Sequence, residues 1–312
     1  HFKKIYLICR STKKNQKFKE KIKKNIELVK FKNILSLLSE IRHIKILIIS
    51  ITPFSFLLSL MLIIFGADKK NVFLFIRSDG FLEYEVKFGK IGYLFYAFMF
   101  YILKHRAKIL SCSKFLTGIS KPKILFPSEI NNEWLKNRDI RKKGINKNKI
   151  KLLYVGRFRK EKGYSSLIDI FENFKSNFTL KLVGNDFKYL KKNYYPKNPN
   201  IQILGQIVTN KDLIKCYDNC DMFILPSYAE AYPQVILESL SRLKPVIVFN
   251  EIKFLKKTFS VGVFNSQRNA KDLQKVISRI AINYSKIQKK IYKQKIFTQK
   301  NFFIEMNKIF SN

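Results

Sequence analysis

The sequence predicts an α/β fold made of two doubly wound domains. Short β-branched runs alternate with longer helical patterns along the 312 residues, which is typical of parallel sheets with crossover helices. A polar, charged stretch over residues 126 to 149 separates two such series, and a hydrophobic content of 46% is enough for two cores. Two such domains facing each other leave a cleft at the carboxyl ends of their strands, where ligands bind.

The first series contains six predicted strands, at residues 5–9, 26–31, 45–50, 72–77, 107–113 and 123–126. The 22 residues from 46 to 67 carry no formal charge, which is long enough to cross a bilayer. Thr52 and Pro53 divide this run into a strand and a helix, with Thr52 as N-cap and Pro53 at the first helical position. A membrane span and a helix lying in the membrane plane are the alternatives. A second apolar run, residues 91–103, is too short to span.

The second series predicts strands at residues 151–156, 179–184, 201–205, 221–226, 245–249 and 261–264. Helical patterns separate these strands, for example at residues 164–174 and 212–220. We therefore expect a second parallel sheet with helices on both faces.

The chain is strongly basic, with 61 Lys and Arg against 22 Asp and Glu and a net charge of +39. The lysines are scattered over every segment, which favours the interpretation that the positive charge is a general effect of composition, with some attraction to anionic surfaces. A dedicated polyanion site is the alternative. No nucleic-acid partner is expected.

The cysteines do not form a metal-binding pattern. Cys9, Cys112, Cys216 and Cys220 have no metal-type spacing with the three His residues. Cys216 and Cys220 are expected on one helical face, and reduced thiols in a cytoplasmic protein are the expected state. His43 and His105 are interpreted as structural or surface residues.

Residues 154 to 163 combine a strand end with two glycines and two cations. Gly156 and Arg157 follow the strand, and Lys162 and Gly163 precede a helix. A guanidinium and an ammonium at this edge suit the growing negative charge of a diphosphate leaving group. An ordinary turn with surface cations is the alternative.

Residues 226 to 241 supply two acids at the start of an apolar helix. Pro233 is predicted at the first helical position, so the free N–H groups between Ala231 and Val235, including those of Tyr232 and Gln234, favour an anion. Glu230 lies just outside the helix, where it can meet a sugar hydroxyl. Glu238 lies between one and two turns in, placed to accept hydrogen bonds from a ribose diol. Solvated acids that balance excess Lys are the alternative.

These two motifs together resemble the retaining glycosyltransferases of family 4, glycosyl transferases group 1. Gly156, Arg157, Lys162 and Gly163 match G-R-x4-K-G, and Pro226, Ser227, Glu230 and Glu238 match P-S-x2-E-x7-E, followed by "PVIV". The resemblance implies the GT-B fold of two Rossmann-like domains around a central cleft. It also implies that Arg157 and Lys162 bind the donor diphosphate, Glu230 the donor sugar and Glu238 the nucleotide ribose. No metal and no cofactor are implied, because the nucleotide-sugar is a substrate.

The resemblance also sets the expected domains. Residues 1–144 are expected to form an acceptor-side domain, residues 145–290 a donor domain, and residues 291–312 a helix that crosses back to the first domain. No counterpart of the family's first strand and glycine-rich loop precedes residue 2, so the chain resembles an N-terminally short member.

The chain departs from the family pattern at three places. Ala231 and Leu243 stand where members usually carry Gly. Where the family often has a His, this chain has Arg77, Ser78 and Asp79, which are candidate acceptor-side groups.

Two classes of function follow. The first is metal-independent sugar transfer, of hexosyltransferase type, to a glycan or lipid-linked acceptor in envelope polysaccharide (such as lipopolysaccharide) biosynthesis. The protein would then be cytoplasmic and in peripheral contact with the anionic inner membrane. The second is a non-catalytic, basic membrane- or polyanion-binding protein that keeps the fold. A glycan phosphorylase or synthase of similar fold is a further enzyme class.

Overall fold

The computed structural model describes residues 5–8, 26–28, 41, 44–113, 116, 122–138, 140, 144–146, 149–172, 174, 178–185 and 196–311. The chain divides into two compact units: unit 1 is His1–Ser111, Ile119–Ile124 and Glu305–Asn312, and unit 2 is Cys112–Gly118 and Leu125–Ile304. Residues 125 to 144 belong to unit 2, whereas the sequence analysis expected the boundary between the domains after residue 144. Cys9, His43 and the ends of the first two predicted strands lie outside the described residues.

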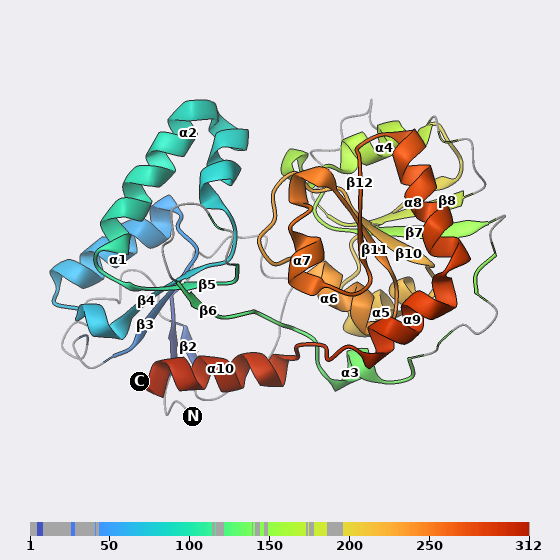
Figure 1. The fold of residues 1–312 in the computed structure, drawn as a ribbon. Helices are drawn as coiled ribbons and strands as arrows, with labels where there is room; N and C mark the ends of the chain where they lie inside the picture. The colour runs from blue at the N-terminus through green and yellow to red at the C-terminus, as the bar shows by residue number, and fades with distance from the viewer. Residues whose placement is uncertain are drawn as a thin grey trace. The chain divides into compact units, whose positions relative to one another are not determined.

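Unit 1 contains two parallel sheets (Figure 1). One has the order β3-β4-β5-β6, and the other pairs β1 with β2. The strands are β1 (Ile5–Leu7), β2 (Ile26–Leu28), β3 (Ile46–Ile49), β4 (Val72–Ile76), β5 (Lys108–Ser111) and β6 (Lys123–Ile124). The helices are α1 (Pro53–Ile64), the 3-10 turn η3 (Lys69–Asn71), α2 (Gly80–Lys104) and part of α10 (Gln299–Ser311).

The uncharged run after residue 45 forms a strand and a helix, as predicted. Thr52 is the N-cap of α1, its hydroxyl accepts from the Ser55 N–H, and Ser55 completes a capping box. Pro53 is the first helical residue, where its missing N–H costs nothing.

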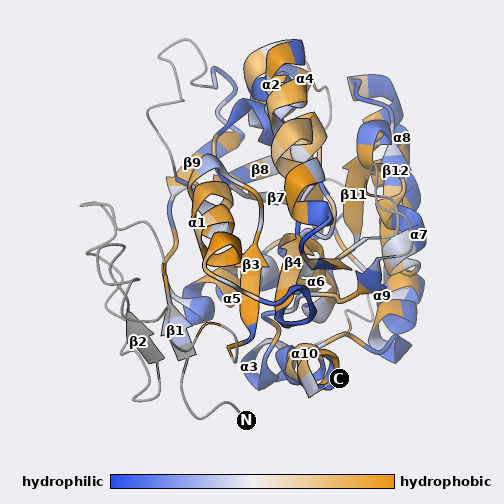
Figure 2. Ribbon diagram, turned by 90° about the vertical axis from the view of Figure 1, so that its left-hand side faces the viewer, coloured by the Kyte–Doolittle hydropathy of each residue, from blue (hydrophilic) through white to orange (hydrophobic). Residues whose placement is uncertain are grey.

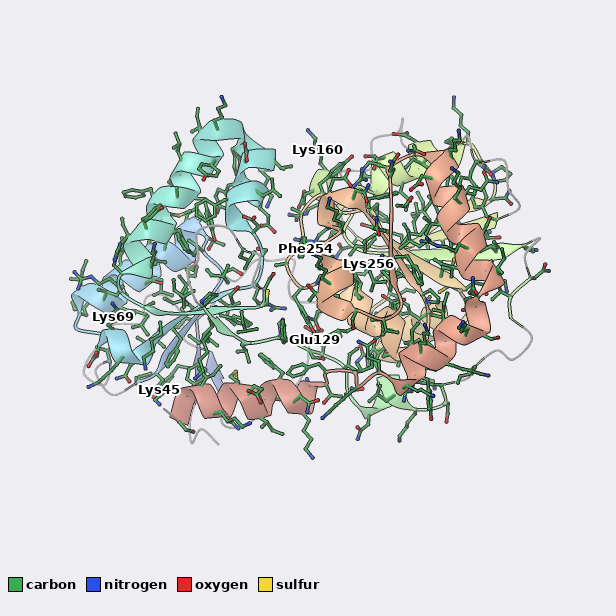
Figure 3. All side chains as sticks on the ribbon, in the orientation of Figure 1. Lys45, Lys69, Glu129, Lys160, Phe254 and Lys256 are labelled. Atoms are coloured by element: carbon green, nitrogen blue, oxygen red, sulfur yellow. The ribbon has the colours of Figure 1, made fainter. Side chains whose placement is uncertain are left out.

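The end of α10 belongs to unit 1. The Phe310 ring packs on Phe73 of β4 with ring centroids 4.4 Å apart, and the Lys45 ammonium donates to the Phe310 carbonyl (Figure 3 labels Lys45). The predicted terminal helix over residues 291–312 is in fact the end of α9 followed by α10, with a break between Lys293 and Gln299.

α2 is a helical hairpin rather than one straight helix. Gly89 has φ 67° and ψ −158°, values that are not helical and that glycine adopts far more readily than other residues. Phe81 in the first arm packs on Tyr96 and Phe100 in the second, at centroid distances of 4.9 Å and 5.3 Å. A Cβ on Gly92 would lie 2.3 Å from the Tyr84 carbonyl oxygen, so glycine is needed where the arms meet. Figure 1 shows the two arms as an inverted V.

The hairpin bears on whether α2 has the length to cross a membrane. Among the described helices, α2 is the one whose length and composition would suffice to cross a bilayer. Its second arm alone has about 15 residues and is roughly 22 Å long, shorter than a hydrocarbon core of about 30 Å.

Unit 2 contains one parallel sheet of six strands in the order β12-β11-β10-β7-β8-β9. The strands are β7 (Ile150–Val155), β8 (Phe178–Val183), β9 (Ile201–Gly205), β10 (Met222–Leu225), β11 (Val246–Phe249) and β12 (Val263–Ser266). The α-helices are α3 (Asn132–Leu135), α4 (Tyr164–Glu172), α5 (Asn210–Asp218), α6 (Gln234–Ser241), α7 (Leu255–Phe259), α8 (Ala270–Ile282) and α9 (Tyr284–Lys293). The 3-10 turns are η4 (Lys160–Lys162) and η7 (Asn250–Ile252).

Helices cover both faces of this sheet. Met222 and Ile224 of β10 belong to a core with residues of α4 and α8, while Phe223 and Leu225 belong to a core with residues of α5 and α6. Because successive strand residues point to opposite faces, a run that is apolar at every position fits a doubly wound sheet. The α/β class and the parallel sheets predicted from the sequence are confirmed.

The strand order places a topological switch point between β7 and β10. Going outward from β7, the chain runs through β8 and β9 on one side, and then through β10, β11 and β12 on the other. Ligands of doubly wound sheets bind where the direction of this progression reverses, beyond the carboxyl ends of the strands. The loops after β7 and β10 therefore flank the expected binding position.

Arg242, the C-cap of α6, joins α3, α5 and α6. It is buried, and its guanidinium bonds both carboxylate oxygens of Asp218 at 2.8 Å and 2.9 Å. It also donates to the carbonyls of Trp134, Lys136 and Asn137. All five guanidinium hydrogens can be used in this way.

We expect Arg242→Met to destabilise unit 2 by about 3 kcal/mol, because removing one partner of a buried network leaves the others unsatisfied. Urea unfolding followed by the fluorescence of Trp134, the single Trp of the chain, measures it. Arg279→Met, an exposed position on α8, is the control and should change stability by less than about 0.5 kcal/mol. Equal effects of the two changes would contradict the role given to Arg242.

Candidate active site

The loop after β7 is held tightly at the carboxyl edge of the sheet. The Gly156 N–H donates to the Val183 carbonyl and the Phe158 N–H to the Asn185 carbonyl, both at 3.0 Å. The buried Tyr154 hydroxyl donates to the Arg157 carbonyl at 2.9 Å. The Arg157 side chain itself is exposed. The backbone of this loop is thus fixed while its guanidinium faces solvent.

The loops after β7 and β10 meet at Gly163. Gly163 has φ +66°, and a Cβ there would lie 2.0 Å from the Pro226 carbonyl oxygen, closer than any side chain can pack. The Tyr228 N–H donates to the Glu161 carbonyl at 3.0 Å, a second link between the same loops. The two sequence motifs therefore lie side by side.

This junction pairs Lys162 with Glu230. The Lys162 ammonium lies 2.7 Å from Oε1 of Glu230, and the side chains are 21% and 11% exposed. The Ser227 hydroxyl donates to the same oxygen at 2.7 Å. The structure thus brings together a residue that the resemblance assigns to the donor diphosphate, Lys162, and the one assigned to the donor sugar, Glu230, with Ser227 as a further partner.

The start of α6 differs from the prediction by one residue. Pro233 is the N-cap and Gln234 is the first helical residue, because Pro233 has the extended ψ of 124°. Pro233 has no side chain that caps the helix, so the first-turn N–H groups of Gln234 and Val235 lack an intrahelical acceptor. These N–H groups remain the candidate anion donors.

The side chains in this stretch pack within unit 2. The Tyr232 ring lies between Phe126 and Phe259, with centroid distances of 4.8 Å to each, and burial raises the Tyr232 pKa. The Gln234 amide donates to the Pro127 carbonyl and accepts from the Glu129 N–H (Figure 3 labels Glu129). Tyr232 and Gln234 therefore hold the segment that leads into α3, and only their backbone groups are candidates for ligand binding.

Glu238 is bound to a neighbouring helix. The Tyr217 hydroxyl, from α5, donates to Glu238 Oε2 at 2.8 Å. Burial raises the pKa of Glu238 from 4.5 to about 7; the Tyr217 hydrogen bond opposes this shift and the Glu129 charge adds to it. Among the described contacts, the Glu238 carboxyl group thus accepts a hydrogen bond from the neutral Tyr217 hydroxyl and forms no ion pair.

Arg268, which the sequence analysis did not single out, ties the site loops together. It follows β12 and donates to the Glu251 carboxylate at 2.7 Å, to the Ser166 hydroxyl at 2.8 Å and to the Pro226 carbonyl at 2.9 Å. Its guanidinium also lies 4.0 Å from the centre of the Tyr228 ring. The signal in the sequence is weak, since an Arg before a helix N-cap is a common surface residue.

The remaining predicted residues lie in unit 1 or elsewhere in unit 2. Arg77, Ser78 and Asp79 follow β4, and Asp79 caps α2 by accepting from the Leu82 N–H at 3.1 Å. Their acceptor-side role stays a prediction. The helix with Cys216 ends at Asp218, so Cys220 does not share its helical face. Within the described ranges, no group of three His, Cys, Asp or Glu side chains could hold a metal.

We expect Arg268→Met to weaken ligand binding, because the loops of the site lose the three hydrogen bonds that hold them together. The Met side chain keeps the contact with Tyr228, and the lost hydrogen bonds should lower the free energy of unfolding by roughly 2 to 3 kcal/mol. Arg268→Lys keeps the charge and forms fewer bonds, so its effect should lie between. Isothermal titration with nucleoside diphosphates measures binding, and urea unfolding measures stability. Unchanged affinity in folded Arg268→Met would show that this clamp only supports the fold.

Glu238 predicts an unusual dependence of stability on pH. Since its folded pKa of about 7 lies above its ordinary 4.5, the folded state holds the proton more tightly, and stability falls as pH rises between these values. We expect Glu238→Gln to raise the stability of the unliganded protein by up to about 3 kcal/mol at pH 8 and by little at pH 4.5. Urea unfolding at both pH values tests this, with the exposed Glu133→Gln as control. Equal gains at both pH values would rule out ionisation as the cause.

Comparison with known proteins identifies the family of the chain. Residues 136–296 match the family described as glycosyl transferases group 1. A protein of the cps region of Klebsiella pneumoniae is 30% identical over 138 residues, 43% of this chain and 36% of that protein. The N,N'-diacetylbacillosaminyl-diphospho-undecaprenol α-1,3-N-acetylgalactosaminyltransferase of Campylobacter jejuni is 26% identical over 173 residues, 52% of this chain and 42% of that protein. The alignments thus cover less than half of either relative.

Among solved structures, Anabaena HepE in complex with UDP and glucose is similar, with a TM-score of 0.68 and 15% identity over 92% of this chain and 86% of that one. This likeness concerns the fold, and it confirms the predicted GT-B class. The family match covers the β7 loop, the β10 loop and all six strands of unit 2. This chain belongs to the glycosyl transferases group 1 family.

Proposed function

We propose that the chain is a retaining glycosyltransferase that moves a sugar from a nucleotide-sugar donor to a glycan or lipid-linked acceptor in envelope polysaccharide biosynthesis. The observation that carries the proposal is the Lys162–Glu230 pair at the switch point between β7 and β10. Doubly wound sheets bind ligands at this position, and the pair offers both a cation for a phosphate and an acid for a sugar.

In the proposed complex, charge at the leaving diphosphate is stabilised by three groups. The Arg157 guanidinium and the Lys162 ammonium supply positive charge, and the N–H groups of Gln234 and Val235 at the start of α6 supply aligned dipoles. Such preorganised donors stabilise charge that develops as the sugar–phosphate bond breaks. We propose that these groups need no metal ion and no cofactor.

The two acids are proposed to bind the sugar and the ribose. Glu230 accepts hydrogen bonds from Lys162 and Ser227 on one oxygen, which leaves its other oxygen for a sugar hydroxyl. Glu238 would accept from the ribose diol in place of, or beside, Tyr217. Because the pKa of unliganded Glu238 is about 7, hydrogen bonds from a bound diol would favour its ionised form.

The acceptor class is proposed from the relatives. The name of the Campylobacter jejuni relative specifies a diphospho-undecaprenol, which is a lipid-linked substrate, and the Klebsiella pneumoniae relative is encoded in a cps region. A lipid-linked acceptor suits a basic chain with a net charge of +39 that is cytoplasmic and contacts the anionic inner membrane.

We expect Glu230→Gln to abolish sugar transfer while keeping the fold, because the neutral amide forms no ion pair with Lys162 and is a weaker hydrogen-bond acceptor than the carboxylate. The measurement is release of the free nucleotide (UDP, GDP, ADP or CMP) from UDP-, GDP-, ADP- and CMP-linked sugars with a lipid-linked oligosaccharide acceptor, beside donor-induced shifts in Tm. Glu133→Gln, an exposed acid on α3, is the matched control and should keep full turnover.

The outcomes separate the two classes of function. A Tm shift with one nucleotide class, weakened in Glu238→Gln, supports a donor site in unit 2. Full turnover in Glu230→Gln would overturn the catalytic assignment. Absence of any donor shift, together with salt-sensitive binding to a polyanion such as heparin, would support the non-catalytic alternative.

A further inference from the structure

The second arm of the α2 hairpin exposes a continuous apolar surface, which we call the α2 outer face. It consists of Ile91, Leu94, Phe95, Phe98 and Tyr101, which are 79%, 66%, 47%, 58% and 54% exposed. At 100° per residue these side chains fall within an arc of about 120°. The opposite arc holds Gly92, Tyr96, Met99, Phe100 and Leu103, all of which are buried.

This helix is apolar on all sides, but the protein covers only one of them. No charged residue lies between Ile91 and Leu103. A helix that is apolar all round is found in a core or in contact with lipid. Figure 2 shows the apolar character of α1 and α2 beside the mixed colouring of α8 and α9. The α2 outer face is thus the side that the fold leaves mostly exposed, although the Phe98 ring contacts Phe56 of α1 and the Phe95 ring contacts Tyr84 of the first arm.

The hairpin geometry favours a helix lying in the membrane plane over a span. The second arm is too short to cross a bilayer, and its inner side packs on the Phe81 ring of the first arm. At the tip, Phe88 and Ile91 are 65% and 79% exposed. Aromatic and aliphatic side chains on one face of such a helix enter the boundary between headgroups and acyl chains.

Cations border this face at both ends. At the tip Lys90 is exposed, and Lys87 is exposed but lies 3.7 Å from the Glu83 carboxylate. At the other end the Lys104 ammonium lies 5.0 Å from the centre of the Tyr101 ring, and Arg106 is exposed. Lysines beside apolar residues place their stems against lipid and their ammonium groups at the headgroups. An anionic lipid surface complements this charge, whereas a second copy of a chain with a net charge of +39 would be repelled.

We propose that the α2 outer face and the hairpin tip dock on an anionic lipid bilayer, with the helix axis of the second arm in the membrane plane. The inference deepens the membrane contact of the proposed function, on which it rests, by naming the surface that makes it. Its test needs no sugar transfer, so the two proposals can fail separately.

The experiment is co-sedimentation of the full 312-residue chain with vesicles of phosphatidylcholine alone or mixed equally with phosphatidylglycerol. We expect the wild type to bind the mixed vesicles at least about tenfold more strongly, since each cation near an anionic surface contributes to binding. Ile91→Glu/Leu94→Glu should lower this binding about tenfold or more, because two carboxylates enter the apolar contact.

The matched control is Val208→Glu/Ile282→Glu in unit 2. These residues are 67% and 68% exposed, so the control removes two similar side chains and adds the same charge. It should change vesicle binding by less than about twofold, because it adds the same general charge but leaves the α2 outer face unchanged. Equal losses in the two double variants, or equal binding of the wild type to both kinds of vesicle, would overturn the proposal.

Two further measurements keep the proposal falsifiable if Ile91→Glu/Leu94→Glu fails to fold. In Phe95→Trp the new indole should be quenched by brominated lipids, whereas the buried Trp134 of the wild type should not be; quenching absent from both would contradict docking. Sedimentation without vesicles tests self-association, and a wild-type dimer that Ile91→Glu dissociates would assign the face to a second copy instead. Donor-induced Tm shifts measured alongside report the donor site independently.

Discussion

The close approach of Gly163 to the Pro226 carbonyl is the constraint on which the candidate site depends. A Cβ at Gly163 would lie 2.0 Å from that oxygen, and the residue has φ +66°, so both space and backbone conformation require glycine. The approach sets Lys162 beside Glu230, and Arg268 bonds the same Pro226 carbonyl from the end of β12. Lys162 and Glu230, which are 68 residues apart in the chain, are thereby fixed at the switch point of one sheet.

The two acids of the site are stabilised very differently in the unliganded protein. Glu230 has a cation and a hydroxyl on one oxygen, so its charge is compensated. Glu238 has the neutral Tyr217 hydroxyl, and burial raises its pKa to about 7. Keeping a carboxyl in such a place costs stability, and the cost grows as the pH rises from 4.5 to about 7. A ligand that donates hydrogen bonds would offset the cost, which is the pattern expected of a binding residue that the fold alone does not need.

Much of the fold could be predicted because its signals are local. The start of α1 is set by Thr52, by Pro53 and by Ser55, three positions after the cap. Each apolar strand run can likewise be recognised from its own residues alone. Three features could not be predicted, because they depend on contacts distant in the chain. The role of Arg268 depends on partners that follow three other strands, namely Ser166, Pro226 and Glu251. Glu238 finds its hydrogen-bond donor on α5, and the reversal of α2 depends on the packing of Phe81 on Tyr96 and on the close contact at Gly92. Leu243 keeps φ +59° without being glycine, held in this strained conformation by its burial in the core.

The two units handle apolar surface in opposite ways. In unit 2 helices pack on both faces of the sheet, which leaves chemistry to the loops at the carboxyl edge. In unit 1 the glycines of α2 fold an apolar segment back on itself, so that one side completes a core and the other stays exposed. A straight helix of the same composition would need a bilayer or a larger core around it. The hairpin instead presents a short, cation-bordered surface, which suits the proposed contact with lipid in the membrane plane.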